Sequence, residues 1–207
     1  MKVHLVFAHP NLDSFNGQLR TTAIDFFKEN NINYSISDLY QINFKASADK
    51  DDFTYLANPN YFDLQFEQAH ALQNGNFVDD IKREQQLLQD ADLIIFQFPL
   101  WWYSMPGLLK GYIDRVFSMG WAYGGAQALK GKRILVSTTT GAPEMAWTED
   151  NRGTIIDIFK HLFIGTFGLT GLNPVEPFIV YGAKRLDDSQ KNTCMIEFSN
   201  YLQNLSV

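Results

Sequence analysis

The feature that most constrains the fold of this chain is a repeated alternation of compact apolar runs with segments of helical apolar spacing. In residues 14–29, for example, Phe15, Leu19, Ala23 and Phe26 recur about once per helical turn. The apolar runs lie at 2–8, 33–40, 91–99, 132–142 and 175–182, and the helical segments at 14–29, 78–89, from 106, 153–168 and 186–205. Five strands alternating with helices predict an α/β fold, an open parallel sheet with helices on both faces.

Residues 41–77 interrupt this alternation. They read as irregular, carry five aromatic side chains (Phe44, Phe53, Tyr55, Tyr61 and Phe62) and contain a short helical pattern only near 64–73. No repeat or linker-like segment divides the chain, so we expect one domain over 1–207, with an excursion at about 41–77. An excursion of this length in a compact domain is usually functional or interfacial.

Composition excludes several classes of protein. The chain has 207 residues, 45% of them hydrophobic, and a net charge of −6, which argues against a nucleic-acid binder. With one cysteine, Cys194, it has no internal disulfide, and its four histidines lack metal-ligand spacing, so we expect no metal. The start reads neither as a signal peptide nor as a membrane span, and we expect a soluble, cytoplasmic protein.

Ligands of open parallel sheets bind beyond the carboxyl ends of the strands, which directs attention to three loops. In the first, "AHPNLDSFN" (8–16), Ser14 can cap the following helix or turn its hydroxyl to a phosphate, with backbone donors from Phe15 to Gly17. An ordinary capped helix explains the same residues. His9 either contacts a ligand or bonds to backbone. Neither G-x-G-x-x-G nor a P-loop lysine is present, which disfavours a nicotinamide Rossmann domain and an NTPase.

The second loop, "FPLWWYSMP" (98–106), places two tryptophans between two prolines. Pro99 ends a strand and Pro106 allows a helix to begin, so residues 100–105 must cross the sheet edge as loop. Its backbone groups and aromatic rings could hold a flat heteroaromatic ligand, or the loop could be a hydrophobic plug or dimer contact. The loop alone does not decide between these readings.

Four motifs together, "AHP…SFN", "SDLY", "FQFPLWWYSMPGLLKGYIDRVF" and "TTGA", resemble the flavodoxin-fold NAD(P)H:quinone oxidoreductases, the DT-diaphorase-like family with its short bacterial members. The resemblance covers most of residues 1–182. It implies a five-stranded sheet of order 2-1-3-4-5 and non-covalently bound FAD, or FMN in some members. It also implies NAD(P)H as co-substrate, a quinone or similar acceptor served in ping-pong order, and a homodimer.

The resemblance also implies a site. It assigns the flavin phosphates to His9, Ser14, Phe15 and Asn16, the edge of the isoalloxazine to Pro99, Leu100, Trp101, Trp102 and Tyr103, and its pyrimidine edge to Thr139, Thr140, Gly141 and Ala142. Trp102, Tyr103 and Trp147 match the positions that border the reacting rings, and we expect them to be catalytic.

The chain departs from the family at several of these positions. Trp101 stands where mammalian members have glutamine, and Ala142 replaces a glycine, which requires a negative φ. Trp147 falls at their active-site tyrosine and no histidine lies near Gly153, so a Tyr–His proton relay does not transfer. Arg152 could compensate an anionic flavin. Residues within 55–70, such as Phe62 and Gln65, could complete the site of a dimer partner.

Three other functions remain open from the sequence. One is an FMN-dependent reductase of azo, nitro or chromate compounds, which the identity of the released flavin distinguishes. A second is a flavin-binding regulatory subunit of a potassium-efflux transporter, which would bind flavin with negligible quinone turnover. A third is a one-electron carrier, which would accumulate a neutral semiquinone on titration.

Overall fold

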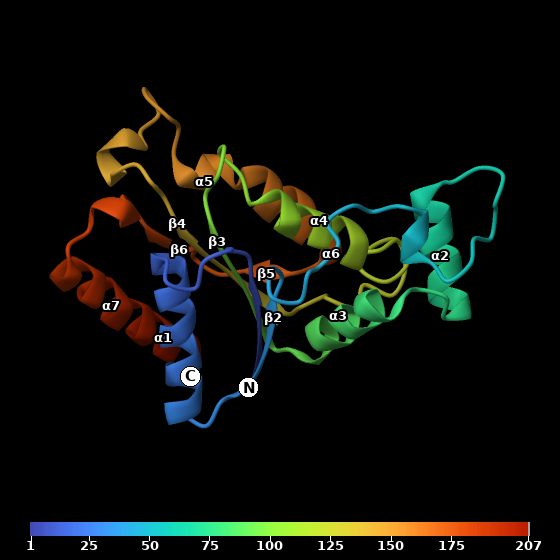
Figure 1. Ribbon diagram of the computed structural model, residues 1–207, viewed down its shortest axis with the longest axis horizontal. Helices are drawn as coiled ribbons and strands as arrows, with labels where there is room; N and C mark the ends of the chain where they lie inside the picture. Colours follow the sequence, from blue (N-terminus) through green and yellow to red (C-terminus); the bar gives the residue numbers. More distant parts are fainter. Residues whose placement is uncertain (207) are drawn as a thin grey trace.

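The computed structural model describes residues 1–206, and its centre is a parallel sheet of predicted order (Figure 1). Strands β1 (Lys2–Phe7), β2 (Asn33–Asp38), β3 (Leu93–Pro99) and β4 (Arg133–Thr139) pair in the order β2-β1-β3-β4, with β5 (Asn173–Pro174) beyond β4. All of these pairs are parallel. The order 2-1-3-4-5 is therefore confirmed, and all strands end at one edge of the sheet.

The fifth strand differs from the prediction, because it is split. β5 (Asn173–Pro174) pairs with the start of β4, and β6 (Phe178–Val180) pairs with its end. The sequence predicted a single strand over 175–182. Pro174 and Pro177 have no backbone N–H to donate, so the ladder against β4 breaks between them.

Helices cover both faces of the sheet (Figure 1). One face packs against α1 (Phe15–Glu29) and α7 (Asp188–Ser206), and the other against α3 (Asp79–Asp90), α4 (Gly107–Val116) and α5 (Ile155–Ile158). The apolar stripe predicted for α1 is buried in the first of these cores. α4 begins just after Pro106, as predicted, and Lys110 and Asp114 form an ion pair on its surface.

The segment predicted to be helical over 153–168 is helical in the structure, but it is not α-helical throughout. α5 has only four residues and is followed by a seven-residue π-helix, η3 (His161–Phe167), and by α6 (Gly168–Thr170). A π turn takes one residue more than an α turn, so Phe167 stays on the buried face five positions after Leu162. Gly171 ends the segment at φ 72°, which the absence of a Cβ permits.

The excursion is more ordered than its sequence indicated. It contains η1 (Lys50–Asp52) and α2 (Leu64–Asn74), the short helix predicted near 64–73. Arg115 of α4, 1% exposed, fastens it to the body. Its guanidinium donates at 2.8 Å to Asp52, at 2.8 Å to Asp80 and at 3.1 Å to the carbonyl of Lys45. The excursion therefore extends from one end of the molecule, at the right of Figure 1, on a buried ionic anchor.

Candidate active site

The first loop ends in a capped helix that still presents donors. The Ser14 hydroxyl accepts from the Gly17 N–H at 3.2 Å and donates to the Asn11 carbonyl at 2.6 Å. In the first turn of α1, the N–H groups of Phe15 and Asn16 have no intrahelical acceptor. Ser14 thus caps the helix, which was one of the two interpretations of its sequence. The capped helix leaves two N–H groups and its positive dipole end for an anion.

Asn16 ties this helix to the strand ends. Its side-chain amide donates to the Thr139 hydroxyl at 2.6 Å, and its backbone carbonyl accepts from the Gln97 side chain at 3.0 Å. The side-chain oxygen of Asn16 is buried and has no hydrogen-bond partner among the described residues. An unpaired buried oxygen is costly, so this atom is suited to accept from a bound molecule.

His9 lies beside the same helix start. Its Nδ1 is 2.9 Å from the Asn11 carbonyl and 3.0 Å from the Ser14 hydroxyl, and its ring centroid is 6.0 Å from that of Trp101. Burial lowers the pKa of His9 from its ordinary value of 6.5; the hydrogen bond with Asn11 opposes this, and the charge of Lys184 adds to it. His9 is therefore a neutral ring at neutral pH.

The second loop is a tight turn in which some backbone groups are paired and others stay free. Trp101 and Ser104 exchange two backbone hydrogen bonds of 3.0 Å, and the Leu100 N–H donates to the Thr139 carbonyl at 2.8 Å, which extends the ladder one residue past Pro99. At its tip, Trp102 and Tyr103 have φ of 49° and 59°. Among the described residues, the N–H groups of Trp102, Tyr103 and Met105 have no backbone acceptor, so the turn still offers free donors to a ligand.

The third loop exposes donors at the end of β4. The Ala142 carbonyl accepts from the Thr140 hydroxyl at 2.6 Å and from the Gly182 N–H at 2.8 Å. Among the described residues, the N–H groups of Gly141 and Ala142 have no backbone acceptor. Ala142 is not among the residues with positive φ, so alanine is tolerated where the family pattern has glycine.

These loops enclose two adjoining cavities. The first, of about 560 Å³, runs from the start of α1 to the turn at Thr139–Gly141 and is also lined by His9 and Trp101. The second, of about 310 Å³, is lined by Trp102, Tyr103, Ala142 and Trp147. Leu100 and Gly141 line both cavities, so the two meet there. The two adjacent tryptophans thus line different cavities, Trp101 the first and Trp102 the second.

The three aromatic residues predicted to be catalytic lie together in the second cavity. The rings of Tyr103 and Trp147 meet edge to face with centroids 5.9 Å apart. The Trp147 indole N–H donates at 3.4 Å to the Ala142 carbonyl, which holds Trp147 over the third loop. Trp102 is 95% exposed, so its ring stands at the mouth of the cavity.

Sequence reasoning missed the basic residues contributed by η4 (Ala183–Arg185) and the start of α7. Lys184 and Lys191 line the first cavity, and Arg185 lines the second together with Arg152. The signal was present: "GAKR" directly follows a strand predicted to be parallel, so it had to lie at the ligand edge.

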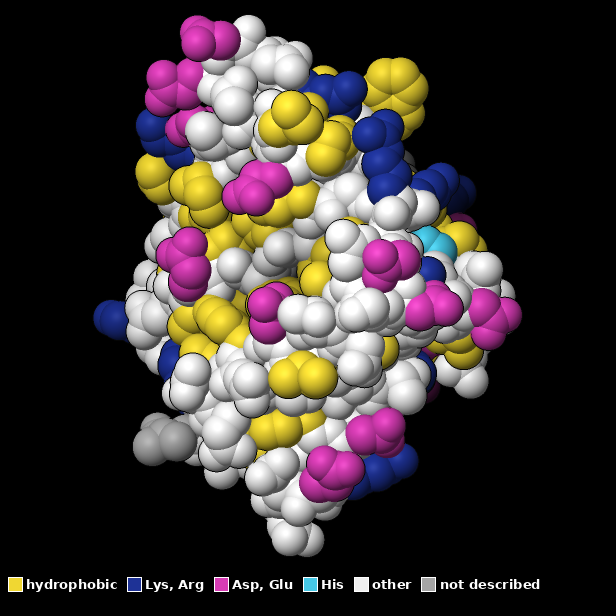
Figure 2. All heavy atoms as spheres, turned by 90° about the vertical axis from the view of Figure 1, so that its left-hand side faces the viewer, with side chains coloured by type: hydrophobic (Ala, Val, Ile, Leu, Met, Phe, Trp, Pro, Cys, Tyr) yellow, Lys and Arg dark blue, Asp and Glu magenta, His cyan; other side chains and the backbone are white. Residues whose placement is uncertain are grey.

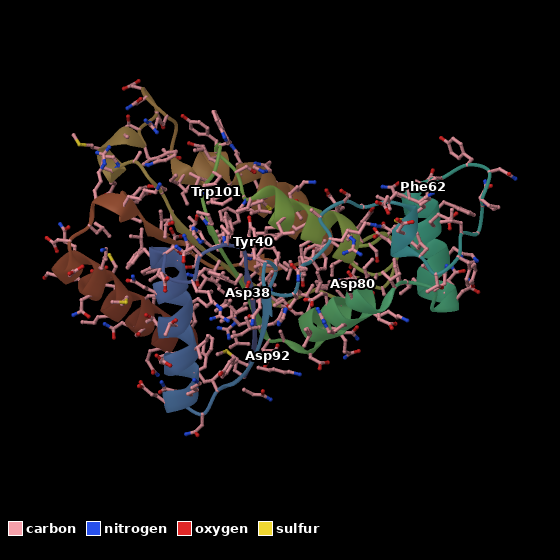
Figure 3. The ribbon with its side chains drawn as sticks, viewed as in Figure 1. Asp38, Tyr40, Phe62, Asp80, Asp92 and Trp101 are labelled. Atoms are coloured by element: carbon pink, nitrogen blue, oxygen red, sulfur yellow. The ribbon has the colours of Figure 1, made fainter. Side chains whose placement is uncertain are left out.

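The excursion residues lie elsewhere. Figure 3 shows Phe62 at the right-hand end of the molecule, well away from Trp101. Gln65 donates to the Tyr123 hydroxyl at 3.1 Å and lines a third cavity of about 670 Å³, against α4 and η3. Neither residue contributes to the two adjoining cavities of its own chain.

The described residues suit a flavin. The helix start offers two N–H groups to a phosphate, the buried side-chain oxygen of Asn16 is unpaired, and Gly141, whose N–H has no backbone acceptor among the described residues, lines both cavities where they meet. The fold defines an α/β domain of the flavodoxin type, and the candidate ligand site lies at the switch point of its sheet. No three His, Cys, Asp or Glu side chains of residues 1–206 are grouped to hold a metal ion, and no helix in that range is long and apolar enough to cross a membrane.

Comparison with known proteins places the chain in a family. A family described by its flavodoxin-like fold matches residues 1–202, and the chain belongs to it. It is 34% identical to a ribosyldihydronicotinamide dehydrogenase [quinone] of Pongo abelii, over 99% of this chain and 91% of the relative. It is 29% identical to NAD(P)H dehydrogenase [quinone] 1 of Cavia porcellus, over 97% and 76%. A solved structure from Klebsiella pneumoniae, described as a candidate quinone reductase, superposes with a TM-score of 0.90 at 32% identity, over 99% and 85%.

Proposed function

We propose that this protein is a flavin-dependent NAD(P)H:quinone oxidoreductase whose single domain spans the chain. The observation that carries the proposal is the pair of cavities that meet at Leu100 and Gly141, one suited to a flavin and the other to a flat substrate. The names of the relatives, quinone dehydrogenases that use dihydronicotinamide compounds, give the same reaction class.

The first cavity favours FAD over FMN. One phosphate at the N–H groups of Phe15 and Asn16 would occupy only the start of α1, whereas the cavity continues to Gln18 and Lys191. Lys184 and Lys191 supply positive charge for a second phosphate beyond the first. Thr139 and Thr140 line the other end of this cavity, toward the turn where the rings would lie.

The flavin would supply the hydride chemistry, accepting from NAD(P)H and giving to the quinone. The chain's own residues bind and orient. Trp102, Tyr103 and Trp147 form aromatic walls against which a nicotinamide or a quinone ring stacks, which fixes its distance and tilt. The N–H groups of Gly141 and Ala142, which have no backbone acceptor among the described residues, would donate hydrogen bonds to the pyrimidine edge of the flavin. Because the same cavity holds both substrates in turn, ping-pong order follows.

We further propose a homodimer in which the excursion of one chain approaches the redox cavity of the other. Large apolar side chains are exposed on the excursion and on the opposed segment η3–α6, namely Tyr61, Phe62, Phe66, Ile164 and Leu169. Exposed apolar side chains gathered on one part of a surface are typical of interfaces. A second chain would also cover Trp102. A reducing, cytoplasmic setting accords with the single cysteine and with NAD(P)H as reductant.

The test combines cofactor analysis with turnover. We expect purified protein to carry about one FAD per chain, identified by chromatography after denaturation, and to oxidise NADH or NADPH with menadione. Folded protein that contains no flavin and does not bind added FAD or FMN refutes the proposal. FMN as the only flavin, with turnover of azo or nitro compounds, favours the reductase alternative. Bound flavin with no turnover favours a regulatory subunit, and an accumulating neutral semiquinone favours an electron carrier.

A further inference from the structure

Two arginines line the second cavity beside its aromatic walls. Arg152 comes from the loop that follows Trp147, and Arg185 from the end of η4, more than thirty positions along the chain. Within residues 1–206, the arginine ion pairs involve Arg20, Arg83 and Arg115, and neither Arg152 nor Arg185 takes part in one. Two segments thus bring two uncompensated guanidinium groups to one small cavity.

The aromatic walls fix where one of these charges lies. The guanidinium carbon of Arg152 is 5.8 Å from the ring centroid of Trp147, within the range of a cation–π contact. Trp147 is itself held by Tyr103 and by the Ala142 carbonyl. Acidic residues occur on the same loop, at 144, 149 and 150, but none pairs with either arginine among the described residues. Figure 2, which views the side of the molecule at the left of Figure 1, shows Lys and Arg side chains gathered toward its upper right.

The lysines of the first cavity lie where a different group would bind. Lys184 and Lys191 line the first cavity, where the flavin phosphates would lie, and they do not line the second. The charge of Arg152 and Arg185 is therefore left for a molecule in the second cavity. Guanidinium groups bind phosphate oxygens through paired N–H donors, more specifically than an ammonium group does.

We propose that Arg152 and Arg185 bind phosphate groups of the nicotinamide co-substrate while its ring stacks on the aromatic walls. This inference rests on the proposed function and specifies it. Ribosyldihydronicotinamide, for which the relative from Pongo abelii is named, has a ribose but no phosphate. This chain would instead select phosphate-bearing NADH or NADPH over the phosphate-free riboside.

The test compares the two kinds of reductant in charge-neutral variants. KM and kcat with menadione are measured for NADH, NADPH and dihydronicotinamide riboside, in the native holoenzyme, Arg152→Gln, Arg185→Gln and the double variant. Each single change should raise KM for the dinucleotides about tenfold and the double change further, with the riboside unchanged, because loss of a charged hydrogen bond is worth about one decade. Lys28→Gln, a change to an exposed lysine at the far end of α1, is the matched control.

A binding measurement separates recognition from turnover. Calorimetry with the oxidised dinucleotides NAD⁺ and NADP⁺ should show the same loss of affinity in the variants and a steeper salt dependence in the native protein. A loss for NADP⁺ alone assigns the arginines to the 2′-phosphate, and an equal loss for both assigns them to the diphosphate. If a glutamine variant fails to fold, Arg152→Lys and Arg185→Lys keep the charge but lose the paired donors, and should show an intermediate KM.

The outcomes keep the two proposals apart. Equal effects on riboside and dinucleotides, or no effect on either, overturn the phosphate assignment while leaving the oxidoreductase intact. A native flavin-loaded protein that oxidises none of the three reductants overturns the proposed function itself.

Discussion

A change of Gly17 to alanine tests how the start of α1 is built. The same change at another glycine should leave the stability unchanged or raise it, whereas at Gly17 it should lower it. Gly17 lies in the first turn of α1, where alanine would ordinarily stabilise the helix by about 0.8–1 kcal/mol. A Cβ on Gly17, however, would lie 1.9 Å from the Leu12 carbonyl oxygen and 2.5 Å from its carbon. Both obstacles are backbone atoms, so no side-chain rotation relieves the clash.

The cost follows from that geometry. Cβ contacts below 3.0 Å are essentially never seen, so the Leu12 peptide must retreat by more than about 1 Å. Leu12 sits between Asn11 and Ser14, whose hydrogen bond would be stretched, which endangers a cap worth about 1 kcal/mol. With about 1–3 kcal/mol for overpacking, and after the helix gain, the net loss is about 2 kcal/mol. For a chain of 207 residues this corresponds to a Tm lower by about 4–8 °C.

The assay pairs Gly17→Ala with Gly107→Ala. Gly107 begins α4, and a Cβ there meets no atom within 4 Å, so alanine should leave Tm unchanged or raise it. Thermal unfolding of the two apoproteins is compared with the FAD dissociation constant, which we expect to rise at least tenfold for Gly17→Ala only. A Gly17→Ala protein as stable as native, with native flavin affinity, would show that the helix start neither needs this close approach nor holds the flavin.

Three further predictions follow from single contacts. Arg115→Met should lower the free energy of unfolding by about 3–5 kcal/mol in urea titrations, because Asp52 and Asp80 lose their buried partner, and should speed proteolysis within 41–77; unchanged cleavage there would refute the anchor. Trp102→Gly should raise apoprotein Tm by a few degrees, since glycine relieves a φ of 49° at a side chain 95% exposed, while quinone turnover falls; a fall in both would contradict the strain argument. Because the pKa of His9 is lowered on folding, apoprotein stability should decline as pH falls below 6.5, the unfolded value, and His9→Asn should flatten that part of the pH–Tm profile; an unchanged profile would contradict it.

Apolar periodicity predicted most of the sheet, and it failed where the strand was short. β1, β3 and β4 are buried on both faces, so their continuous apolar runs are unmistakable. β5 has two residues, one of them proline, and carries no such signal. In 153–168, helical spacing was correct in kind, but apolar spacing alone could not reveal the π turn that keeps Phe167 buried.

The strand ends and the motifs predicted which three loops form the candidate site. The three loops meet at one edge, as parallel topology requires, and Trp102, Tyr103 and Trp147 line one cavity. Lys184 was missed although it follows the last parallel strand, and Lys191 was missed because only the path of the chain after β6 brings it to the start of α1. The anchoring role of Arg115 was likewise invisible, because it depends on partners 63 and 35 positions away.

The residues at the turn of Trp102 and Tyr103 lower the stability of the fold. Two successive aromatic residues adopt left-handed φ values at a place where asparagine or glycine would fit, at a cost of about 1–2 kcal/mol each. Trp102 buries almost nothing within the chain in return. The turn's two hydrogen bonds and the flanking prolines hold the strained geometry, which directs Trp101 to one cavity and Trp102 to the next. A sequence selected only to fold would place Asn-Gly at this tip, so the strain supports the proposal that ligands stack on both sides of the turn.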